Sequence, residues 1–449
     1  MPRNELRTLN LPIAEELGRR AGIRPRVRPE ECASYAIAGK VPKLVFSPRT
    51  LSEASKTIQT LTAEGASVIV RGAGTKQFQP PSPVDVDVVL DATRCSGVID
   101  YVPADLTVTV FAGTTFVELA EVLRAQQQFF AADPPFASDA TIGGILSGRS
   151  SGALRQQYGT PRDNVLGMRV CLSDGSIAFT GSKVVKSVAG YDIAKLFVGA
   201  RGTLGFIGEV TLKVAPLPAE QRGVVATFSS ANQACGAVAQ MSSHALFPMA
   251  TTMHDAASTR HIRALGHVGD GDWTLVVRCG GSRAGAGTLA DAVSKVCMQS
   301  GARSTLLLDH DRILFGWSDI AELAGGAIYA ADRFLNCAIA CLPSEVPAVC
   351  AMGQTHGGNA EVSAHPHAGI VFMHIDATRH DDLIGALHLV AAEAEANGWS
   401  IAYLRAPLPL GAKLRQPVPP SSPIFLMRRV KAALDPTGTF DPGRFLGGI

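Results

Sequence analysis

Four glycines spaced three residues apart, Gly199, Gly202, Gly205 and Gly208, constrain the fold of this chain more than any other feature. The spacing matches neither the 3.6-residue period of a helix face nor the two-residue alternation of a strand. We interpret the stretch as backbone that is kept free of side chains. It lies within a longer segment of mixed helix and strand character, residues 183–216.

The residues that flank these glycines predict a short helix before them and a strand after them. Ile193, Leu196 and Phe197 have the i, i+3, i+4 spacing of one apolar helical face, which predicts a helix over residues 192–200. Apolar and polar residues alternate over residues 210–214, which predicts a half-buried strand. On these residues alone, a tight helix-to-strand connection in any α/β protein explains the pattern as well as a binding loop does.

A second glycine loop, R-G-A-G-T-K at residues 71–76, directly follows an apolar run that predicts a buried strand. Gly72 and Gly74 allow positive φ angles, so that successive N–H groups can converge on one anion. Thr75 and Lys76 add a hydroxyl group and a positive charge. A diphosphate fits this set, and a plain turn is the alternative. The loop is not the G-x-G-x-x-G dinucleotide motif, because the third glycine and a helix opening from the loop are missing.

A third stretch, residues 133–152, is rich in proline, small residues and paired glycines. It predicts a long irregular segment whose backbone is closely approached by another group. Loops of this length are uncommon in compact domains unless they are functional.

Composition excludes several classes of protein. The formal net charge is +2 in 449 residues, without a long run of Lys or Arg, so we predict no nucleic-acid partner. No apolar run reaches the roughly 18 residues of a transmembrane helix, so we predict no transmembrane segment. The nine cysteines are scattered, without a C-x-x-C pair. This distribution argues against a disulfide framework or an iron–sulfur cluster in this chain and suits a reducing cytoplasm.

The glycine loops together resemble one known family. Their sequences resemble the flavin-binding module of the p-cresol methylhydroxylase and vanillyl-alcohol oxidase superfamily. Within this superfamily they most resemble the FAD-binding subunits of bacterial glycolate oxidase complexes. The tail L-D-P-T-G-T-F-D-P-G-R-F resembles the C-terminal segment of those subunits, which folds back near the flavin ring. The matching stretches, in chain order, are 71–76, 141–144, 158–175, 188–205 and 434–445.

The resemblance implies an α+β fold. It consists of a two-subdomain p-cresol methylhydroxylase-type FAD-binding module and a ferredoxin-like antiparallel cap with helices. The predicted strands and helices after residue 218 agree with such a cap, because they repeat a β-α-β-β pattern twice. The predicted domains are an N-terminal extension (1–40), the FAD-binding domain (41–218), the cap or substrate domain (219–420) and a C-terminal segment that returns to the flavin (421–449).

The resemblance also implies the residues that contact FAD. They are Arg71, Gly72, Ala73, Gly74, Thr75, Lys76, Thr141, Ile142, Gly143, Gly144, Gly190, Tyr191, Gly202, Thr203, Gly205, Ile207 and Arg444. Superfamily members that bond their flavin covalently from the first loop carry a histidine at the position of Thr75. A hydroxyl group is a poor nucleophile toward the flavin compared with imidazole, so we predict non-covalent FAD.

Candidates for catalysis are few. Related D-2-hydroxyacid dehydrogenases hold a metal with an H-x-G-D-G-N-x-H strand, and this chain has H-P-H-A-G-I-V-F-M-H instead, without the Asp and the Asn. His365 and His367 could bind a divalent ion, but exposed histidines in a turn explain them better, so we predict no metal site. His374, inside an apolar run, is expected to be a core histidine. Lys186 is the best cation candidate near the flavin, and a solvated loop lysine is the alternative.

Three arginines could hold a substrate carboxylate. Arg278, Arg333 and Arg405 each end a predicted cap element, and a guanidinium group binds a carboxylate through two parallel hydrogen bonds. Ordinary surface arginines explain them equally well.

Three functions are consistent with the resemblance. The first is an FAD subunit of a glycolate oxidase-type complex, which takes part in the oxidation of a small 2-hydroxy acid (glycolate to glyoxylate) beside a second FAD subunit and an iron–sulfur subunit. Such a chain would be cytoplasmic, or peripheral on the inner face of the cell membrane through its partners. The second is a self-sufficient FAD-dependent dehydrogenase for a 2-hydroxy acid or an alcohol. The third is a non-catalytic subunit that holds FAD as a scaffold.

Overall fold

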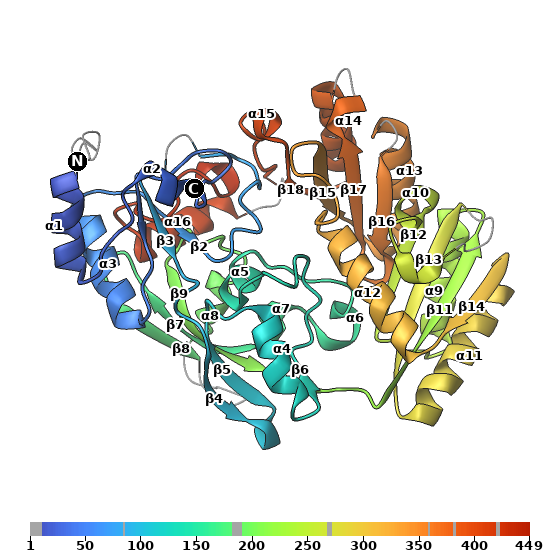
Figure 1. Cartoon of the computed structure of the whole chain (residues 1–449). Coiled ribbons are helices and arrows are strands. Elements are labelled where there is room, and N and C mark those ends of the chain that lie inside the picture. The colour runs from blue at the N-terminus through green and yellow to red at the C-terminus, as the bar shows by residue number, and fades with distance from the viewer. Residues whose placement is uncertain are drawn as a thin grey trace.

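The computed structural model describes residues 11–83, 86–181, 191–266, 272–357, 360–379, 383–418 and 423–449. Two halves lie side by side (Figure 1). The N-terminal half contains two small sheets and a separate pair of short strands, and the cap, residues 217–418, contains one large antiparallel sheet with helices. The C-terminal segment, drawn in red, leaves the cap and returns to the N-terminal half (Figure 1).

A three-stranded parallel sheet, in the order β1-β3-β2, begins the N-terminal half. Its elements are α1 (Leu11–Ala21), α2 (Pro29–Ala33), β1 (Leu44–Phe46), α3 (Leu51–Ala63), β2 (Val68–Arg71) and β3 (Val88–Asp91). Thr50 begins α3, because its hydroxyl group accepts a hydrogen bond from the N–H of Glu53 at 3.1 Å. Apolar side chains of α1, α3 and the sheet share one core, which includes Leu17, Ile58 and Phe46.

The second sheet has five antiparallel strands in the order β4-β5-β9-β7-β8. Short helices pack their apolar side chains against it, including Leu119 and Ile142. The elements are β4 (Val98–Val102), β5 (Thr107–Phe111), α4 (Phe116–Arg124), α5 (Ile142–Ser147), α6 (Arg155–Tyr158), α7 (Pro161–Asn164), β7 (Val165–Cys171), β8 (Ile177–Gly181), α8 (Ala194–Phe197) and β9 (Phe206–Lys213). A further antiparallel pair is formed by β6 (Gln128–Phe129) and β10 (Ala215–Pro216).

The cap is one eight-stranded sheet in the order β14-β11-β13-β12-β16-β17-β15-β18. It consists of two ferredoxin-like β-α-β-β-α-β units, which are joined where β12 pairs with β16. The first unit is β11 (Glu220–Phe228), α9 (Ala231–Ser243), β12 (Ala250–Asp255), β13 (Trp273–Gly281), α11 (Arg283–Gln299) and β14 (Ser304–Leu308). The second is β15 (Phe334–Ala340), α13 (Val346–His356), β16 (Glu361–His365), β17 (Ile370–Asp376), α14 (Leu383–Ala396) and β18 (Ser400–Arg405).

Helices α9, α11, α13 and α14 pack against one face of the cap sheet. Helix α12 (His310–Ala324) packs against the other face and contacts the N-terminal half (Figure 1). The indole N–H of Trp317 donates a hydrogen bond to the buried carboxylate of Asp133 at 3.1 Å. The carboxylate of Glu322 accepts hydrogen bonds from the N–H groups of Phe136 and Ala137 at 2.7 and 3.0 Å. These bonds fix the segment that precedes α5, so α12 sets the position of the cap relative to the N-terminal half.

The C-terminal segment is bound to the first sheet. After the one-turn helix α15 (Leu408–Gly411), helix α16 (Ile424–Leu434) runs back over the N-terminal half (Figure 1). Phe440 is fully buried in the core of the parallel sheet, and its segment forms a parallel bridge with Val68 of β2. The ammonium group of Lys431 joins these parts, because it donates to the carbonyl oxygens of Thr203 and Phe440 and to the carboxylate of Asp435.

The fold confirms the predicted class and corrects several local predictions. The helix expected over residues 192–200 is the four-residue α8, and Ile193 and Leu196 are 41% and 45% exposed, so they do not form a buried face with Phe197. The stretch 133–152 is not irregular throughout, because it contains α5. Gly208 lies inside strand β9.

Several elements were not predicted from the sequence, among them β4, α11, β14 and α12. The buried face of α11 consists mostly of small side chains such as Ala286, Ala290 and Cys297, which give a weak apolar period. β4 lies at a sheet edge with no buried residue, so its sequence lacks the alternation of a half-buried strand. In the part of the chain that the structure describes, no helix has the length and hydropathy needed to cross a bilayer.

Candidate flavin site

The predicted glycine loops and the C-terminal segment meet around a small cavity of about 120 Å³, called here the loop cavity. The loop that follows β2 forms one wall, and the first turns of α5 form the opposite wall. The glycine stretch and the tail close it from two further sides. The lining residues are Ile37, Ile69, Val70, residues 71–77, Gln79, Pro80, Thr141, Gly144, Ser147, Gly148, Arg201, Asp441 and Arg444.

The backbone of the first loop is arranged as an anion site. Gly74 has a φ angle of +81°, which favours glycine. Within the described part of the chain, none of the N–H groups of residues 73–76 donates to a backbone oxygen. These residues are half-buried at the wall of the loop cavity, so their N–H groups are available to donate to a ligand. The hydroxyl group of Thr75 lies in the same wall.

The two walls of the loop cavity are in direct contact at Gly72. A Cβ atom at this position would lie 2.2 Å from Oγ1 of Thr141, far inside the normal contact distance. The same Oγ1 accepts a hydrogen bond from the N–H of Gly144 at 3.2 Å and so begins α5. A glycine is therefore required where the first loop meets α5.

The loop cavity carries a strong excess of positive charge. Among the described residues that line it, four cations face one carboxylate: Arg71, Lys76, Arg201 and Arg444 against Asp441. Asp441 pairs with Arg444 at 3.0 Å, and burial raises the pKa of the Asp441 carboxyl group, although Arg444 opposes this rise. Among the described residues the remaining cations form no ion pair within 4 Å, although Asp91 and Asp441 act on Arg71 and Arg201 from a longer distance. Burying unpaired charges is costly, which indicates that an anion completes the site.

Burial lowers the pKa of two of these cations, Lys76 and Arg201. The ammonium group of Lys76 contacts the carbonyl oxygen of Gly144 and the hydroxyl group of Ser150. Burial, reinforced by the charge of Arg201, lowers the pKa of Lys76 to about 8. Burial and the charge of Arg444 lower the pKa of Arg201 to about 10, and its Nη1 atom is buried without a hydrogen-bond partner.

The glycine stretch continues the loop cavity inward. A pocket of about 40 Å³ shares Gly72, Thr141 and Gly144 with it. The additional walls of this pocket include Gly143, Gly202, Gly205 and Ile207.

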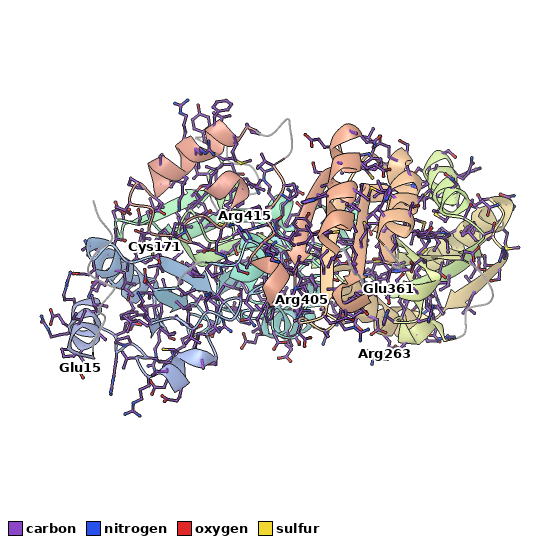
Figure 2. All side chains as sticks on the ribbon, turned by 90° about the horizontal axis from the view of Figure 1, so that it is seen from above. Glu15, Cys171, Arg263, Glu361, Arg405 and Arg415 are labelled. Carbon is purple, nitrogen blue, oxygen red and sulfur yellow. The ribbon has the colours of Figure 1, made fainter. Side chains whose placement is uncertain are left out.

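On its other side the loop cavity adjoins a larger cavity that the cap helps to form. A cavity of about 1270 Å³, called here the junction cavity, shares Thr75, Lys76 and Arg201 with the loop cavity. Its cap wall is formed by β15, β17, β18 and α12, and α16 covers it from the N-terminal half. Figure 2 shows Arg405, the last residue of β18, at this junction.

The structure brings most of the predicted FAD contacts to these three connected spaces. Those that line them are residues 71–76, Thr141, Gly143, Gly144, Gly202, Thr203, Gly205, Ile207 and Arg444. Ile142 is instead fully buried in the core beside the second sheet, and Tyr191 is 94% exposed. Gly190 and the candidate Lys186 lie outside the described residues.

The candidate histidines and two of the candidate arginines lie elsewhere. His365 is buried with its ring edge against Phe372, and burial holds the pKa of His365 well below its usual range, whereas His367 is exposed. His374 is a core histidine whose Nδ1 is bonded to Asn336 at 2.7 Å, although its Nε2 lacks a partner. In the described residues, no group of three or more His, Cys, Asp or Glu side chains could hold a metal ion.

Arg278 and Arg333 are used within the cap. Nε of Arg278 donates to Gln221 at 2.7 Å, and its guanidinium group lies over the ring of Trp317. Arg333 forms an ion pair with Asp376. Of the three predicted arginines, Arg405 lines the junction cavity.

Sequence reasoning missed Arg201, Ile37 and Asp441 as lining residues. Arg201 stands between two of the glycines in V-G-A-R-G-T, so its position in a side-chain-poor stretch was an available signal. Ile37 belongs to the predicted N-terminal extension, and only the packing of that segment beside β2 brings it to the site.

Two family models match this chain. The model described as the FAD binding domain matches residues 42–181, and the model described as the C-terminal domain of FAD linked oxidases matches residues 217–397. The chain thus combines an FAD binding domain with the C-terminal domain of FAD linked oxidases. The first match contains the loop 71–76 and Thr141, and the second spans most of the cap.

Curated relatives are similar to this chain over part of their length. Glycolate oxidase subunit GlcD of Bacillus subtilis is 30% identical over 46% of this chain and 44% of that protein. D-lactate dehydrogenase [cytochrome], mitochondrial, of Arabidopsis thaliana is 33% identical over 47% and 37%. Glycolate oxidase subunit GlcE of Escherichia coli is 32% identical over 38% and 48%. The chain thus spans under half the length of these relatives.

Solved structures show the same fold over nearly the whole chain. P-cresol methylhydroxylase with substrate bound has a TM-score of 0.73 and 16% identity, covering 98% of each chain. The 4-ethylphenol oxidase of Gulosibacter chungangensis has a TM-score of 0.75 and 15% identity, covering 97% of this chain and 98% of that one. These likenesses confirm the predicted p-cresol methylhydroxylase-type architecture.

The residues present fit FAD, the cofactor of this family. A diphosphate needs convergent N–H donors and cations, and the loop cavity offers the free N–H groups of residues 73–76 beside Lys76 and Arg201. The buried, unpartnered Nη1 of Arg201 supplies a further donor. The larger junction cavity, whose cap wall is mostly apolar, suits the flavin ring and a small substrate.

FAD affinity is expected to fall as the pH rises through about 8. Lys76 has a pKa of about 8 in the flavin-free protein, and a bound diphosphate favours its charged form. Below pH 8 Lys76 is already protonated in the flavin-free protein. Above pH 8 Lys76 must take up a proton when FAD binds, so each further pH unit weakens FAD binding up to about tenfold. Titration by flavin fluorescence from pH 6 to about 9.5 measures this dependence. Lys76→Met should remove the inflection, and an identical inflection in that variant would contradict the assignment.

Proposed function

We propose that this chain is the FAD-binding flavoprotein subunit of a glycolate oxidase-type complex and takes part in the oxidation of a small 2-hydroxy acid. The observation that carries the proposal is that the cation-rich loop cavity shares lining residues with the junction cavity, one wall of which the cap forms. The names of the curated relatives, glycolate oxidase subunits and D-lactate dehydrogenases, support the substrate class.

FAD, when bound, supplies the two-electron acceptor for such an oxidation. The backbone of residues 73–76 would hold its diphosphate together with Lys76 and Arg201. Thr75, in place of a histidine, supports a dissociable cofactor. Acid precipitation of the purified protein should therefore release all flavin into the supernatant, and flavin that stays with the polypeptide would contradict this part of the proposal.

The junction cavity supports turnover within a complex. Among its described lining residues there is no histidine or tyrosine, and Asp133 is the one acidic side chain. The Asp133 carboxylate already accepts hydrogen bonds from the N–H of Leu154 and from the indole N–H of Trp317, both at 3.1 Å. It therefore joins the two halves of the protein. A base for the substrate hydroxyl would then come from another part of the assembly.

The proposed partners are a second FAD subunit and an iron–sulfur subunit. The nine cysteines of this chain are all free thiols spread over both halves, and burial raises the pKa of several of them, such as Cys171 and Cys337, to about 12. Such thiols are poor cluster ligands, which supports a partner as the holder of iron–sulfur clusters. A peripheral position on the inner face of the cell membrane would follow from these partners.

Anaerobic bleaching of the flavin tests the proposal. The FAD-loaded chain, alone and co-purified with its partner subunits, is mixed with glycolate, D-lactate or L-lactate. We expect bleaching in the complex with at least one of these acids. Bleaching of the chain alone would favour a self-sufficient dehydrogenase. Oxidised flavin on this subunit in the presence of every acid, with the complex active, would favour a scaffold role and contradict the proposal.

A further inference from the structure

Arg405 lies where the cap meets the N-terminal half (Figure 2). It ends β18, at the irregular register between β15 and β18 near Asn336. The next residue, Ala406, donates its N–H to the carbonyl oxygen of Phe78 at 3.1 Å. The end of β18 is therefore attached to the segment that follows the first glycine loop.

The guanidinium group of Arg405 is held from several sides. Its Nη1 atom donates to the carbonyl oxygens of Gly326 and Tyr329 at 3.0 and 3.1 Å. The rings of Phe78 and Phe136 flank it, with centroids 5.6 and 5.5 Å from Cζ. Both phenylalanines come from the N-terminal half and line the junction cavity. The group is thus fixed in place before any ligand binds.

Part of this fixed guanidinium group is unused. Its Nε atom is buried and has no hydrogen-bond partner. Within the described residues no carboxylate forms an ion pair with Arg405; burial lowers the pKa of Arg405, and the exposed Asp332 opposes this only partly. A positive charge that lacks a counterion in a partly desolvated cavity favours an anionic ligand.

The rest of the cap wall is uncharged. Among the described cap residues that line the junction cavity, Arg405 carries the one charge. The others are mostly small or apolar, including Ala338, Ala340, Phe372 and Leu404. A ligand bound against this wall would place one anionic group at Arg405 and an apolar group against the remaining surface.

We propose that Arg405 binds the carboxylate of the substrate and that the cap wall selects a 2-hydroxy acid with an apolar side chain over glycolate. This inference rests on the proposed function for the reaction, but the carboxylate site itself does not depend on turnover. Phe78 and Phe136 act as positioning residues, because they hold the guanidinium plane between the two halves.

Binding of inert carboxylates tests the proposal without any reaction. Phenylacetate and its neutral analogue phenylacetamide are titrated into the FAD-loaded chain, with perturbation of the flavin absorbance as the readout. Thermal shift of the flavin-free protein gives a second readout. We expect phenylacetate to bind more tightly than both acetate and phenylacetamide. Equal binding of acetate and phenylacetate would overturn the apolar selection, and equal binding of phenylacetamide would overturn the carboxylate site.

Substitutions at Arg405 locate the site. Arg405→Met should weaken phenylacetate binding at least about 30-fold, because charge-assisted hydrogen bonds are lost, while FAD affinity stays within about twofold. Arg405→Lys retains the positive charge but cannot form two parallel hydrogen bonds, so an intermediate loss of phenylacetate affinity is expected. This variant replaces Arg405→Met in the test if the methionine variant folds poorly. Arg415→Met is the matched control, because Arg415 also donates through Nη1 to two carbonyl oxygens but is exposed and does not line the cavity.

The outcomes separate this inference from the proposed function. Undiminished phenylacetate binding in Arg405→Met, or no binding to the FAD-loaded wild type, would overturn the role of Arg405. Arg405-dependent binding without flavin bleaching by any 2-hydroxy acid in the complex would confirm the carboxylate site and contradict the proposed reaction. Bleaching that is fastest with glycolate and insensitive to Arg405→Met would retain the reaction and reject this inference.

Discussion

Gly72→Ala is expected to weaken FAD binding about 100-fold. The added Cβ atom would lie 2.2 Å from Oγ1 of Thr141 and 3.2 Å from its Cβ, so the first glycine loop and α5 must move apart. Overpacking of this kind costs about 1–3 kcal/mol, and here the movement opens the walls that hold the diphosphate. Equilibrium titration of the flavin-free variant with FAD, followed by fluorescence, measures the loss.

A second substitution shows whether the contact is responsible. Thr141→Ala removes the clashing oxygen, so Gly72→Ala combined with Thr141→Ala should bind FAD more tightly than Gly72→Ala alone, despite the lost cap of α5. Gly236→Ala in α9 is the matched control, because a Cβ atom there meets nothing within 4 Å. Unchanged FAD affinity in Gly72→Ala would mean that the loop cavity is not the diphosphate site.

Lys431→Met is expected to destabilise the protein by about 3–5 kcal/mol. Lys431 and Asp435 form a 2.6 Å ion pair whose side chains are 13% and 0% exposed, and the lysine also joins the tail to the glycine stretch. Removing one partner of a buried pair leaves the other charge uncompensated. Denaturant unfolding, monitored by circular dichroism, gives the change in the free energy of unfolding.

The charge left behind is the main cause of this loss. Asp435→Asn added to Lys431→Met should recover part of the stability, because it removes the uncompensated charge. The amide oxygen can still accept one of the two hydrogen bonds that the N–H groups of Thr439 and Phe440 donate to separate carboxylate oxygens. Arg169→Met, which breaks the more exposed pair with Glu209, should change the stability much less. A loss below about 1 kcal/mol for Lys431→Met would show that the pair does not hold the tail in place.

Short-range sequence patterns predicted much of this structure. The loop 71–76 depends on neighbouring residues, so the loop and the strand before it could be predicted locally. The glycines at 199–205 indicated a backbone site for the same reason, whereas the return of the tail 434–445 was implied by the resemblance to flavoprotein subunits. The repeated β-α-β-β pattern of the cap also predicted its fold class.

Tertiary structure decided which side chains the site uses. Arg201 and Arg405 look like ordinary arginines in the sequence, and only the convergence of the glycine stretch, the cap and the tail gives them buried, unpartnered nitrogen atoms in connected cavities. His365 and Arg333 look equally suitable in the sequence, but packing places them in the core and in an ion pair.

The physical reason is the range of the interactions involved. Glycine conformations and helix caps are set within about four residues, so the chain's own sequence determined the loops that can receive an anion. Desolvation and charge pairing at the junction depend on residues more than a hundred positions apart, such as Phe136 and Arg405. Those contacts exist only once both halves are folded against each other.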